Sequence, residues 1–215
     1  MAIKTHILNS AGHFDKYLDR IKSEIDNAFI LFNEHLTIDN IDVIVENNPP
    51  SVIPEVGSGG YSSSENTIYL YLDVNSDKLE HALSEGIRKT ILHEGHHCLR
   101  WQSPGYGETL FEALVTEGLA DHFQLEVTGG EAEPWATNLT TEELVTTEKM
   151  AKKEFHQDYN HAAWFYGSDD LGIKKWTGYS LGFKIIKRYK ELTKETAADL
   201  VNTPASKIFE RLYSK

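Results

Sequence analysis

The segment TILHEGHHCLRW, residues 90–101, places four ionisable side chains, His93, Glu94, His96 and His97, within five positions. On a helix, His93 and His97 project from the same face one turn apart, so both imidazoles can bind one metal ion. Glu94 is offset around the helix, where its carboxylate can reach a water molecule at the metal without being a ligand. These residues form an H-E-x-x-H pattern, which predicts a catalytic metal site.

A third protein ligand is expected, because a catalytic zinc ion takes three protein ligands and keeps one position for water. Glu117, in EALVTEGLADHF, follows His97 by twenty positions, which is enough to end one helix, turn and return along a second. Asp121 lies one turn later, where its carboxylate can accept the free ring N–H of a ligating histidine and fix its tautomer. Two imidazoles and one carboxylate favour Zn²⁺, and we expect one ion per chain.

The neighbouring side chains offer alternatives to this ligand set. His96 could replace His97, but it would place Glu94 less well, so we expect it to face solvent or to support the site. We expect His122 to be a polar helix residue rather than a ligand. Cys98 is predicted to be a small core residue turned away from the two ligating histidines.

The remaining histidines show no spacing typical of ligands, and we expect them at the surface or at helix caps. They are His6, His13, His35, His81, His156 and His161.

The elements around these residues can be read from hydrophobic periodicity. Apolar side chains at three- and four-residue steps predict a helix over 13–36, and β-branched and aromatic residues predict strands at 41–46 and 67–73. The stretch between the strands holds three of the six prolines, which predicts a long irregular connection. Further helices are predicted at 77–100 with an N-cap at Ser76 or Asp77, at 108–127 ending at Gly129 and Gly130, at 141–157, at 177–192 and at the C-terminus.

Strands followed by helices indicate an α+β fold rather than alternating β-α-β units. We expect a small N-terminal mixed sheet packed on the 77–100 helix, followed by a mainly helical C-terminal lobe. The predicted organisation is a single catalytic domain, 1–215, with sublobes 1–100 and 101–215. Its length is sufficient to bury a hydrophobic core.

Composition excludes several classes of partner. The net charge of −12 repels phosphate backbones and anionic lipid, so we expect neither nucleic acid nor a membrane as partner. A single cysteine excludes an internal disulfide, and the sequence contains neither a signal peptide nor a membrane-spanning run, which makes the cytoplasm the expected location. No feature specifies an oligomeric state.

The segments HEGHH and EGLAD resemble the motif of gluzincin metallopeptidases, the thermolysin-like clan. LHEGHHCLRW, LFEALVTEGLAD and WTGYSLGFKII together resemble, over about residues 57–190, a bacterial family of predicted zinc-dependent proteases. The resemblance implies a thermolysin-like fold in which His93, His97 and Glu117 hold zinc and Glu94 acts as general base. It does not specify the substrate, and our first hypothesis is a zinc peptidase that acts on a peptide or protein. The alternatives are a zinc amidase with a non-peptide substrate and a zinc-bound regulatory module; Glu94 disfavours the latter, since a structural zinc site has no use for it.

Such a reaction forms an oxyanion, which needs a hydrogen-bond donor besides the metal. Tyr179 is our candidate, because Gly178 and Gly182 on either side would let the backbone approach the cleft. His161 and Tyr166 are second choices, and the alternative for Tyr179 is a core position in the last long helix.

Thermolysin-like enzymes bind peptide as an added strand, so the 67–73 strand could offer a sheet edge, unless it is an interior strand. The segment GSGGYSSS is either a flap over the cleft or a solvated loop.

Overall fold

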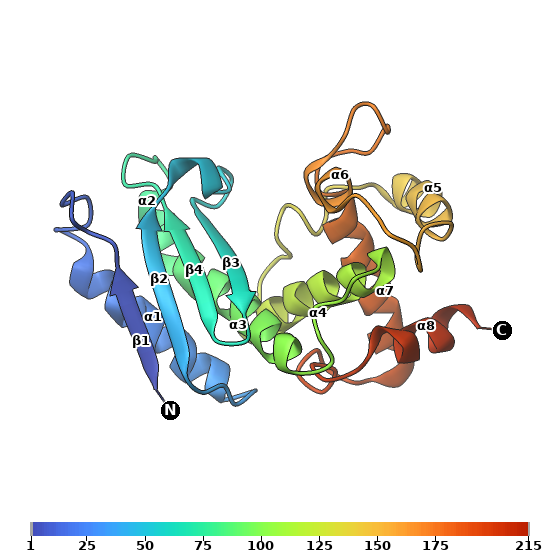
Figure 1. Ribbon diagram of the computed structural model, residues 1–215, viewed down its shortest axis with the longest axis horizontal. Helices are drawn as coiled ribbons and strands as arrows, with labels where there is room; N and C mark the ends of the chain where they lie inside the picture. The colour runs from blue at the N-terminus through green and yellow to red at the C-terminus, as the bar shows by residue number, and fades with distance from the viewer. Residues whose placement is uncertain (1, 215) are drawn as a thin grey trace. The chain divides into compact units, whose positions relative to one another are not determined.

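A computed structural model describes residues 2–214 and shows an α+β chain (Figure 1). It divides into two compact units, Met1–Gln102 and Ser103–Lys215. The first unit contains the sheet and the second is helical. Within the described residues, none of the helices combines the length and the apolar character needed to cross a membrane.

The first unit combines four strands with two long helices. Its elements are β1 (Ile3–Ile7), α1 (Leu18–Asn33), β2 (Ile41–Asn47), a 3-10 turn (Pro49–Ser51), β3 (Ser58–Ser64), β4 (Thr67–Leu72), α2 (Leu79–His81), a π turn (Ala82–Gly86) and α3 (Ile87–Gln102).

The sheet is mixed, with strand order β1-β2-β4-β3. The pairs β1–β2 and β2–β4 are parallel, whereas β3 runs antiparallel to β4. Alternate residues such as Val43, Val45, Ile68 and Leu70 are fully buried, as expected when one face of a sheet packs on a core. The mixed α+β architecture predicted from the sequence is therefore confirmed.

Of the two alternatives for the 67–73 strand, the interior position is confirmed, because β4 lies between β2 and β3. One edge of the sheet is formed by Ser58–Ser64, within the segment that was expected to be a flap or a loop. Its sequence, SGGYSSS, has little intrinsic strand preference, so its extended conformation depends on pairing with β4.

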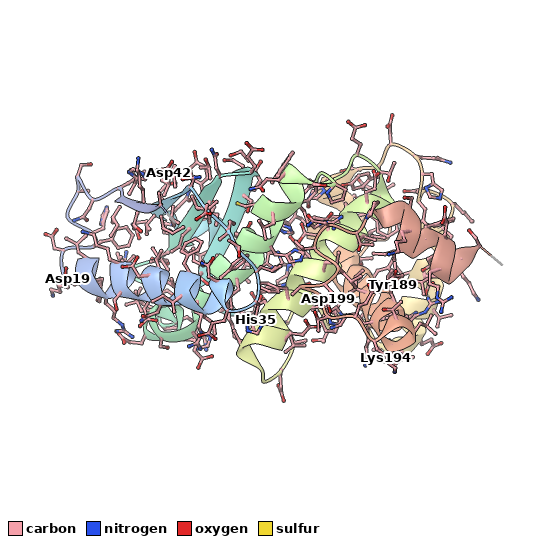
Figure 2. All side chains as sticks on the ribbon, turned by 90° about the horizontal axis from the view of Figure 1, so that it is seen from below. Asp19, His35, Asp42, Tyr189, Lys194 and Asp199 are labelled. Carbon is pink, nitrogen blue, oxygen red and sulfur yellow. The ribbon has the colours of Figure 1, made fainter. Side chains whose placement is uncertain are left out.

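Helices α1 and α3 lie on the same face of the sheet (Figure 1), and Asp42 points away from α1 on the other face (Figure 2). The two helices pack closely at Gly95, where an added Cβ would lie 2.7 Å from the ring of Phe32. Gly95 is one of the two variable positions of the H-E-x-x-H pattern. Its lack of a side chain lets a buried aromatic ring pack directly under the motif.

The predicted 77–100 helix is correct in position but not in regularity. It consists of the short α2, a π turn and α3. The expected N-cap at Ser76 or Asp77 is wrong, because α2 has Lys78 at its N-cap position and no side-chain cap. The hydroxyl of Ser76 accepts from the backbone N–H of Lys78 at 3.1 Å, which lies just before the helix. The π turn was not predicted, because Leu79, Leu83, Ile87 and Ile91 keep a four-residue spacing through it, which is also typical of one continuous helix.

The second unit contains five helices among its described residues. They are α4 (Leu110–Thr128), α5 (Thr141–Ala151), α6 (His161–Tyr166), α7 (Thr177–Thr193) and α8 (Ala205–Tyr213). Capping boxes begin α4 at Thr109 and α5 at Thr140, and Gly129, with φ of 68°, ends α4 as predicted. Helix α5 stops six residues before the predicted end, and α6 was missed because six residues are too few to show a period.

Helices α4 and α7 cross at two glycines. A Cβ added to Gly118 would lie 2.4 Å from the carbonyl oxygen of Gly182, and one added to Gly182 would lie 2.3 Å from the carbonyl oxygen of Leu114. The expectation that Gly178 and Gly182 bring backbone close to the cleft is therefore corrected. Gly182 admits the backbone of α4, and Gly178 admits the ring of Phe165.

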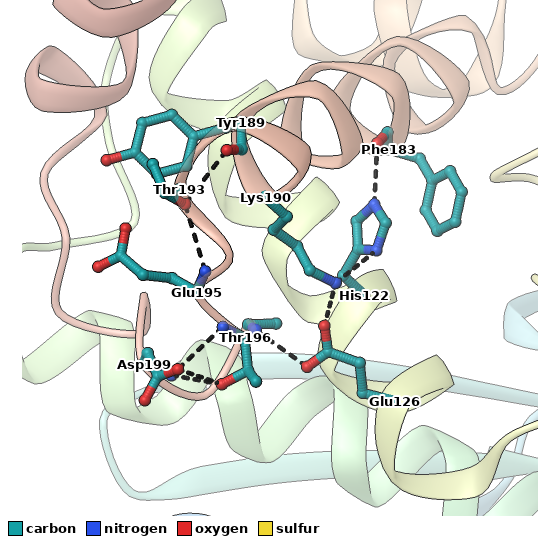
Figure 3. A network of polar contacts seen from close by, with 10 residues as sticks. His122, Glu126, Phe183, Tyr189, Lys190, Thr193, Glu195, Thr196 and Asp199 are labelled. Carbon is teal, nitrogen blue, oxygen red and sulfur yellow. Dashed lines mark hydrogen bonds and ion pairs between the residues drawn. The ribbon is translucent and has the colours of Figure 1, made fainter.

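Polar contacts also join α4 to α7 (Figure 3). The imidazole of His122 donates through Nε2 to the Phe183 carbonyl at 2.9 Å and accepts through Nδ1 from Lys190 at 3.2 Å. Lys190 also pairs with Glu126, whose second oxygen accepts from the backbone N–H of Ala197 at 2.9 Å. Burial, followed by the charge of Lys190, lowers the pKa of His122 to about 4, so this histidine is neutral at physiological pH.

A second polar cluster joins α5, α7 and α8 around Glu148. This buried carboxylate accepts from Lys184 at 3.0 Å, Arg188 at 2.7 Å and the Tyr213 hydroxyl at 2.8 Å. Burial raises the pKa of Glu148, but these hydrogen bonds outweigh it and lower the pKa to about 2. The three helices are thus held by one satisfied buried charge.

We predict that Gly182→Ala destabilises the protein by about 3 kcal/mol, since the new methyl group collides with main-chain atoms of α4 that cannot move aside cheaply. Helix propensity alone would give the opposite sign, about 1 kcal/mol of stabilisation. Urea unfolding followed by far-UV circular dichroism measures the difference. Lys187→Ala, at an exposed position of the same helix, is the matched control and should change stability by less than about 0.5 kcal/mol; a stabilised Gly182→Ala protein would contradict the packing argument.

Candidate metal centre

His93 and His97 lie on the buried face of α3, as their four-residue spacing predicts. Their Nε2 atoms are 3.0 Å apart and their ring planes are nearly perpendicular, at 89°. Both side chains are buried. The helix therefore directs two imidazole nitrogens at one point inside the protein.

This separation fits a shared metal ion. Two nitrogens bound at about 2.05 Å to a tetrahedral zinc ion are roughly 3.3 Å apart, so the two Nε2 atoms need to move only a few tenths of an ångström. Imidazole is also a ligand that zinc prefers. The pair is thus suited to hold a zinc ion with little rearrangement.

The side chain of Glu94, on α3, packs against β3. The hydroxyl of Ser62 lies 2.8 Å from Oε2 of Glu94 and 2.7 Å from its backbone oxygen. Gly60 provides the space, since a Cβ at this position would lie 2.7 Å from Cγ of Glu94 and 2.5 Å from Cγ2 of Thr90. The buried carboxylate is therefore held by a strand residue that is 32 positions away in the sequence.

Two further contacts hold Ser62 in place. The Trp101 indole donates to the Ser62 carbonyl at 3.3 Å, and the Cys98 thiol lies 3.8 Å from the Ser62 hydroxyl. Cys98 is fully buried, as predicted, and burial is the main cause that raises its pKa to about 12. Cys98 is accordingly a neutral thiol that contacts Ser62, the hydrogen-bond partner of Glu94.

One of the two alternatives for His96 is wrong. It was expected to face solvent or to support the site, and its side chain is completely buried, which excludes the solvent-facing position. The supporting role stays a prediction.

Glu117 lies on α4 in the second unit and is buried. The hydroxyl of Tyr106 donates to its Oε1 atom. Burial, followed by the negative charge of Glu117, raises the pKa of Tyr106 well above its usual value. One turn later, Oδ1 of the buried Asp121 accepts from the indole of Trp135 at 2.9 Å.

An aromatic cluster within the second unit includes two residues, Tyr159 and His161, on which the charge of Glu117 acts. The Tyr159 hydroxyl lies 2.9 Å from Nδ1 of His161, and this imidazole stacks on Phe165 with ring centroids 4.5 Å apart. Phe165 in turn contacts Tyr179, with centroids 4.9 Å apart.

Burial and the charge of Glu117 together raise the pKa of Tyr159 to about 12. Burial lowers the pKa of His161, although the charge of Glu117 opposes this shift. Two oxyanion candidates, Tyr179 and His161, thus belong to one aromatic cluster. The third, Tyr166, contacts His161 with ring centroids 6.2 Å apart but is 63% exposed.

Comparison with known proteins identifies the family. The family model described as "Predicted Zn-dependent protease (DUF2268)" matches residues 18–210. This chain belongs to the DUF2268 family.

A more distant similarity comes from Bacillus subtilis (strain 168). Its uncharacterized protein YjaZ is 26% identical over 167 residues, which cover 74% of this chain and 60% of YjaZ. The chain thus spans about 60% of the length of the curated relative that it matches. No solved structure shows a significant match.

Two residues of this DUF2268 protein were missed by the sequence analysis, Ser62 and Tyr106. Ser62 lies in GSGGYSSS, which was expected to be a flap or a loop, and Tyr106 lies in SPGYG, between the predicted helices 77–100 and 108–127. The available signal was a polar side chain within two residues of a glycine in both segments, GGYS and GYG. Nothing in the sequence pairs these residues with Glu94 or Glu117, since both contacts join different elements.

We predict that Ser62→Ala lowers the free energy of unfolding of this DUF2268 protein by about 1 to 3 kcal/mol, because Glu94 loses its hydroxyl partner while it remains buried. Ser63→Ala, at the adjacent exposed position of β3, should change it by less than about 0.5 kcal/mol. Urea unfolding of both variants measures the contrast. Equal effects of the two substitutions would show that the Ser62 hydroxyl does not stabilise the buried carboxylate.

Proposed function

We propose that this protein is a zinc-dependent peptidase in which His93, His97 and Glu117 together hold one Zn²⁺ ion. One observation carries the proposal: the buried imidazoles of His93 and His97 converge, and the adjacent Glu94 carboxylate is fixed by a hydrogen bond from Ser62 instead of by the two histidines. A purely structural zinc site gains nothing from such a carboxylate, whereas a hydrolase needs it as a base. Membership of a family described as predicted Zn-dependent proteases supports the same function.

The proposed third ligand follows from the chain path. Helix α3 ends at Gln102 and α4 begins at Leu110, so only a short connection separates the histidine pair from the helix that carries Glu117. Asp121, one turn after Glu117, is our candidate to accept the second ring N–H of a ligating histidine, which would strengthen that ligand.

In the proposed mechanism, a bound zinc ion would supply Lewis-acid chemistry, polarising the substrate carbonyl and lowering the pKa of water toward neutrality. Glu94 accepts a proton from the attacking water and passes it to the leaving amine. Ser62 keeps the Glu94 carboxylate in one orientation during this transfer. No other base is needed, because the same carboxylate serves both steps.

Tyr179 is the proposed donor to the oxyanion, and His161 is the second candidate. A Tyr159 hydroxyl that donates to Nδ1 of His161 leaves the imidazole proton on Nε2, where it can also serve as a donor. Removing such a donor from a hydrolase typically costs about 10²- to 10³-fold in rate, so single substitutions of Tyr179 and His161 can tell the two apart.

We propose that the substrate binds as an extended peptide along β3. Among the described strands, β3 pairs only with β4, and Ser58 at its start is additionally bridged to Ile53. The part of the edge from Gly60 onward can pair with an added strand through main-chain hydrogen bonds. Gly60 and Ser62 of this edge strand contact the side chain of Glu94, so a peptide bound there would pass close to the proposed general base.

Zinc content provides the first test. We predict that His93→Ala, His97→Ala and Glu117→Ala each lose most of the bound zinc, because removal of one of three ligands weakens the site strongly. Glu94→Gln and the control His122→Ala should keep about one zinc per chain. Plasma mass spectrometry after dialysis measures the content; a fully loaded His97→Ala protein would refute the ligand assignment.

Cleavage provides the second test. A diverse peptide mixture is incubated with zinc-loaded wild type and with zinc-loaded Glu94→Gln, and the products are sequenced by mass spectrometry. We predict cleavage by wild type and a rate about 10²- to 10⁴-fold lower for the variant, the usual contribution of a general base. If both proteins carry zinc and neither cleaves any peptide, the peptidase assignment fails in favour of an amidase or a binding role.

A further inference from the structure

Tyr106 lies in a turn whose conformation depends on glycine. It is flanked by Gly105 and Gly107, with φ of 107° and 109°, in a region of backbone conformation that side chains strongly disfavour. Gly107 also packs against α4, since a Cβ there would lie 2.2 Å from Cβ of Glu112. The sequence GYG therefore fixes the backbone on both sides of one tyrosine.

The same tyrosine is tied to α4 at two neighbouring residues. The hydroxyl of Thr116 donates to the backbone oxygen of Tyr106 at 2.8 Å, and the phenol of Tyr106 donates to Oε1 of Glu117. Thr116 and Glu117 are both buried. Backbone and side chain of Tyr106 are thus anchored to the helix that carries the carboxylate, which leaves the phenol little freedom to move.

We propose that Tyr106 is a positioning residue that holds the Glu117 carboxylate in the orientation in which it binds zinc. This inference rests on the proposed function, because it takes Glu117 as a zinc ligand. A carboxylate at the end of a glutamate side chain must lose rotational freedom when it binds a metal, and a hydrogen bond that is already in place removes part of this cost. Groups that orient metal ligands in this way typically contribute 10- to 100-fold to metal affinity.

Tyr159 provides a matched control in the same cluster. The charge of Glu117 acts on this tyrosine as well. Its hydroxyl, however, is bound to Nδ1 of His161 rather than to the carboxylate. Removing the Tyr159 hydroxyl therefore deletes a similar partly buried group near Glu117 without deleting the proposed contact.

The test is the zinc affinity of the full-length protein, measured by competition with a chromophoric chelator. We expect the Kd of Tyr106→Phe to rise about 10- to 100-fold, and that of Tyr159→Phe to change by less than about threefold, since only the former loses a bond to Glu117. Urea unfolding of both variants is measured alongside. Unchanged zinc affinity in Tyr106→Phe, or an equal loss in Tyr159→Phe, would overturn the inference.

A double variant separates positioning from a general structural effect. In a Glu117→Ala background, Tyr106→Phe should change the residual zinc affinity by less than about threefold, because the side-chain oxygen that Tyr106 orients is already gone. A full 10- to 100-fold loss in that background would show that Tyr106 acts by another route. If wild type binds no zinc, both the proposed function and this inference fail; if only Tyr106→Phe behaves like wild type, this inference alone fails.

Discussion

The backbone contact between α4 and α7 is the constraint on which the second unit depends. At Gly118 and Gly182 the two helices approach so closely that no side chain fits between them. Glu117 is adjacent to Gly118, so the helix position that carries the proposed ligand is fixed by main-chain packing, which has no rotamers to exchange. The His122–Lys190–Glu126 network adds a directional restraint to this contact. Buried and polar contacts thus cooperate to hold one short stretch of α4.

The first unit uses glycine for a similar purpose on a smaller scale. Gly95 lets the Phe32 ring pack under α3, and Gly60 makes room for the side chain of Glu94 on the strand side. In both places a missing Cβ admits a larger neighbour into a dense core. The result is a proposed base that is held between strand and helix and that has a hydroxyl partner from Ser62.

The two proposed charged participants, Glu94 and Glu117, are each held by a hydroxyl from an irregular or weakly strand-forming segment. The hydroxyl of Ser62 donates a hydrogen bond to Glu94, and the hydroxyl of Tyr106 donates one to Glu117. A buried carboxylate is costly without such partners, because burial disfavours its charge. Donors fixed in advance reduce this cost and also reduce the reorganisation that metal binding or proton transfer requires. Buried carboxylates with fixed hydrogen-bond donors are consistent with the family's description as predicted Zn-dependent proteases.

The sequence by itself determined the features that depend on local geometry. The placement of His93 and His97 on one helical face, the end of α4 at Gly129 and the α+β class all follow from periodicity and caps, and the structure confirms them. The roles of the ligands and of Glu94 stay predictions. Only the tertiary structure decided that β3 is an edge strand of the sheet and that Ser62 and Tyr106 donate hydrogen bonds to the two carboxylates. Those features arise from contacts between separate elements, such as the pairing of a serine- and glycine-rich segment with β4, and local propensity contains no information about which elements will meet.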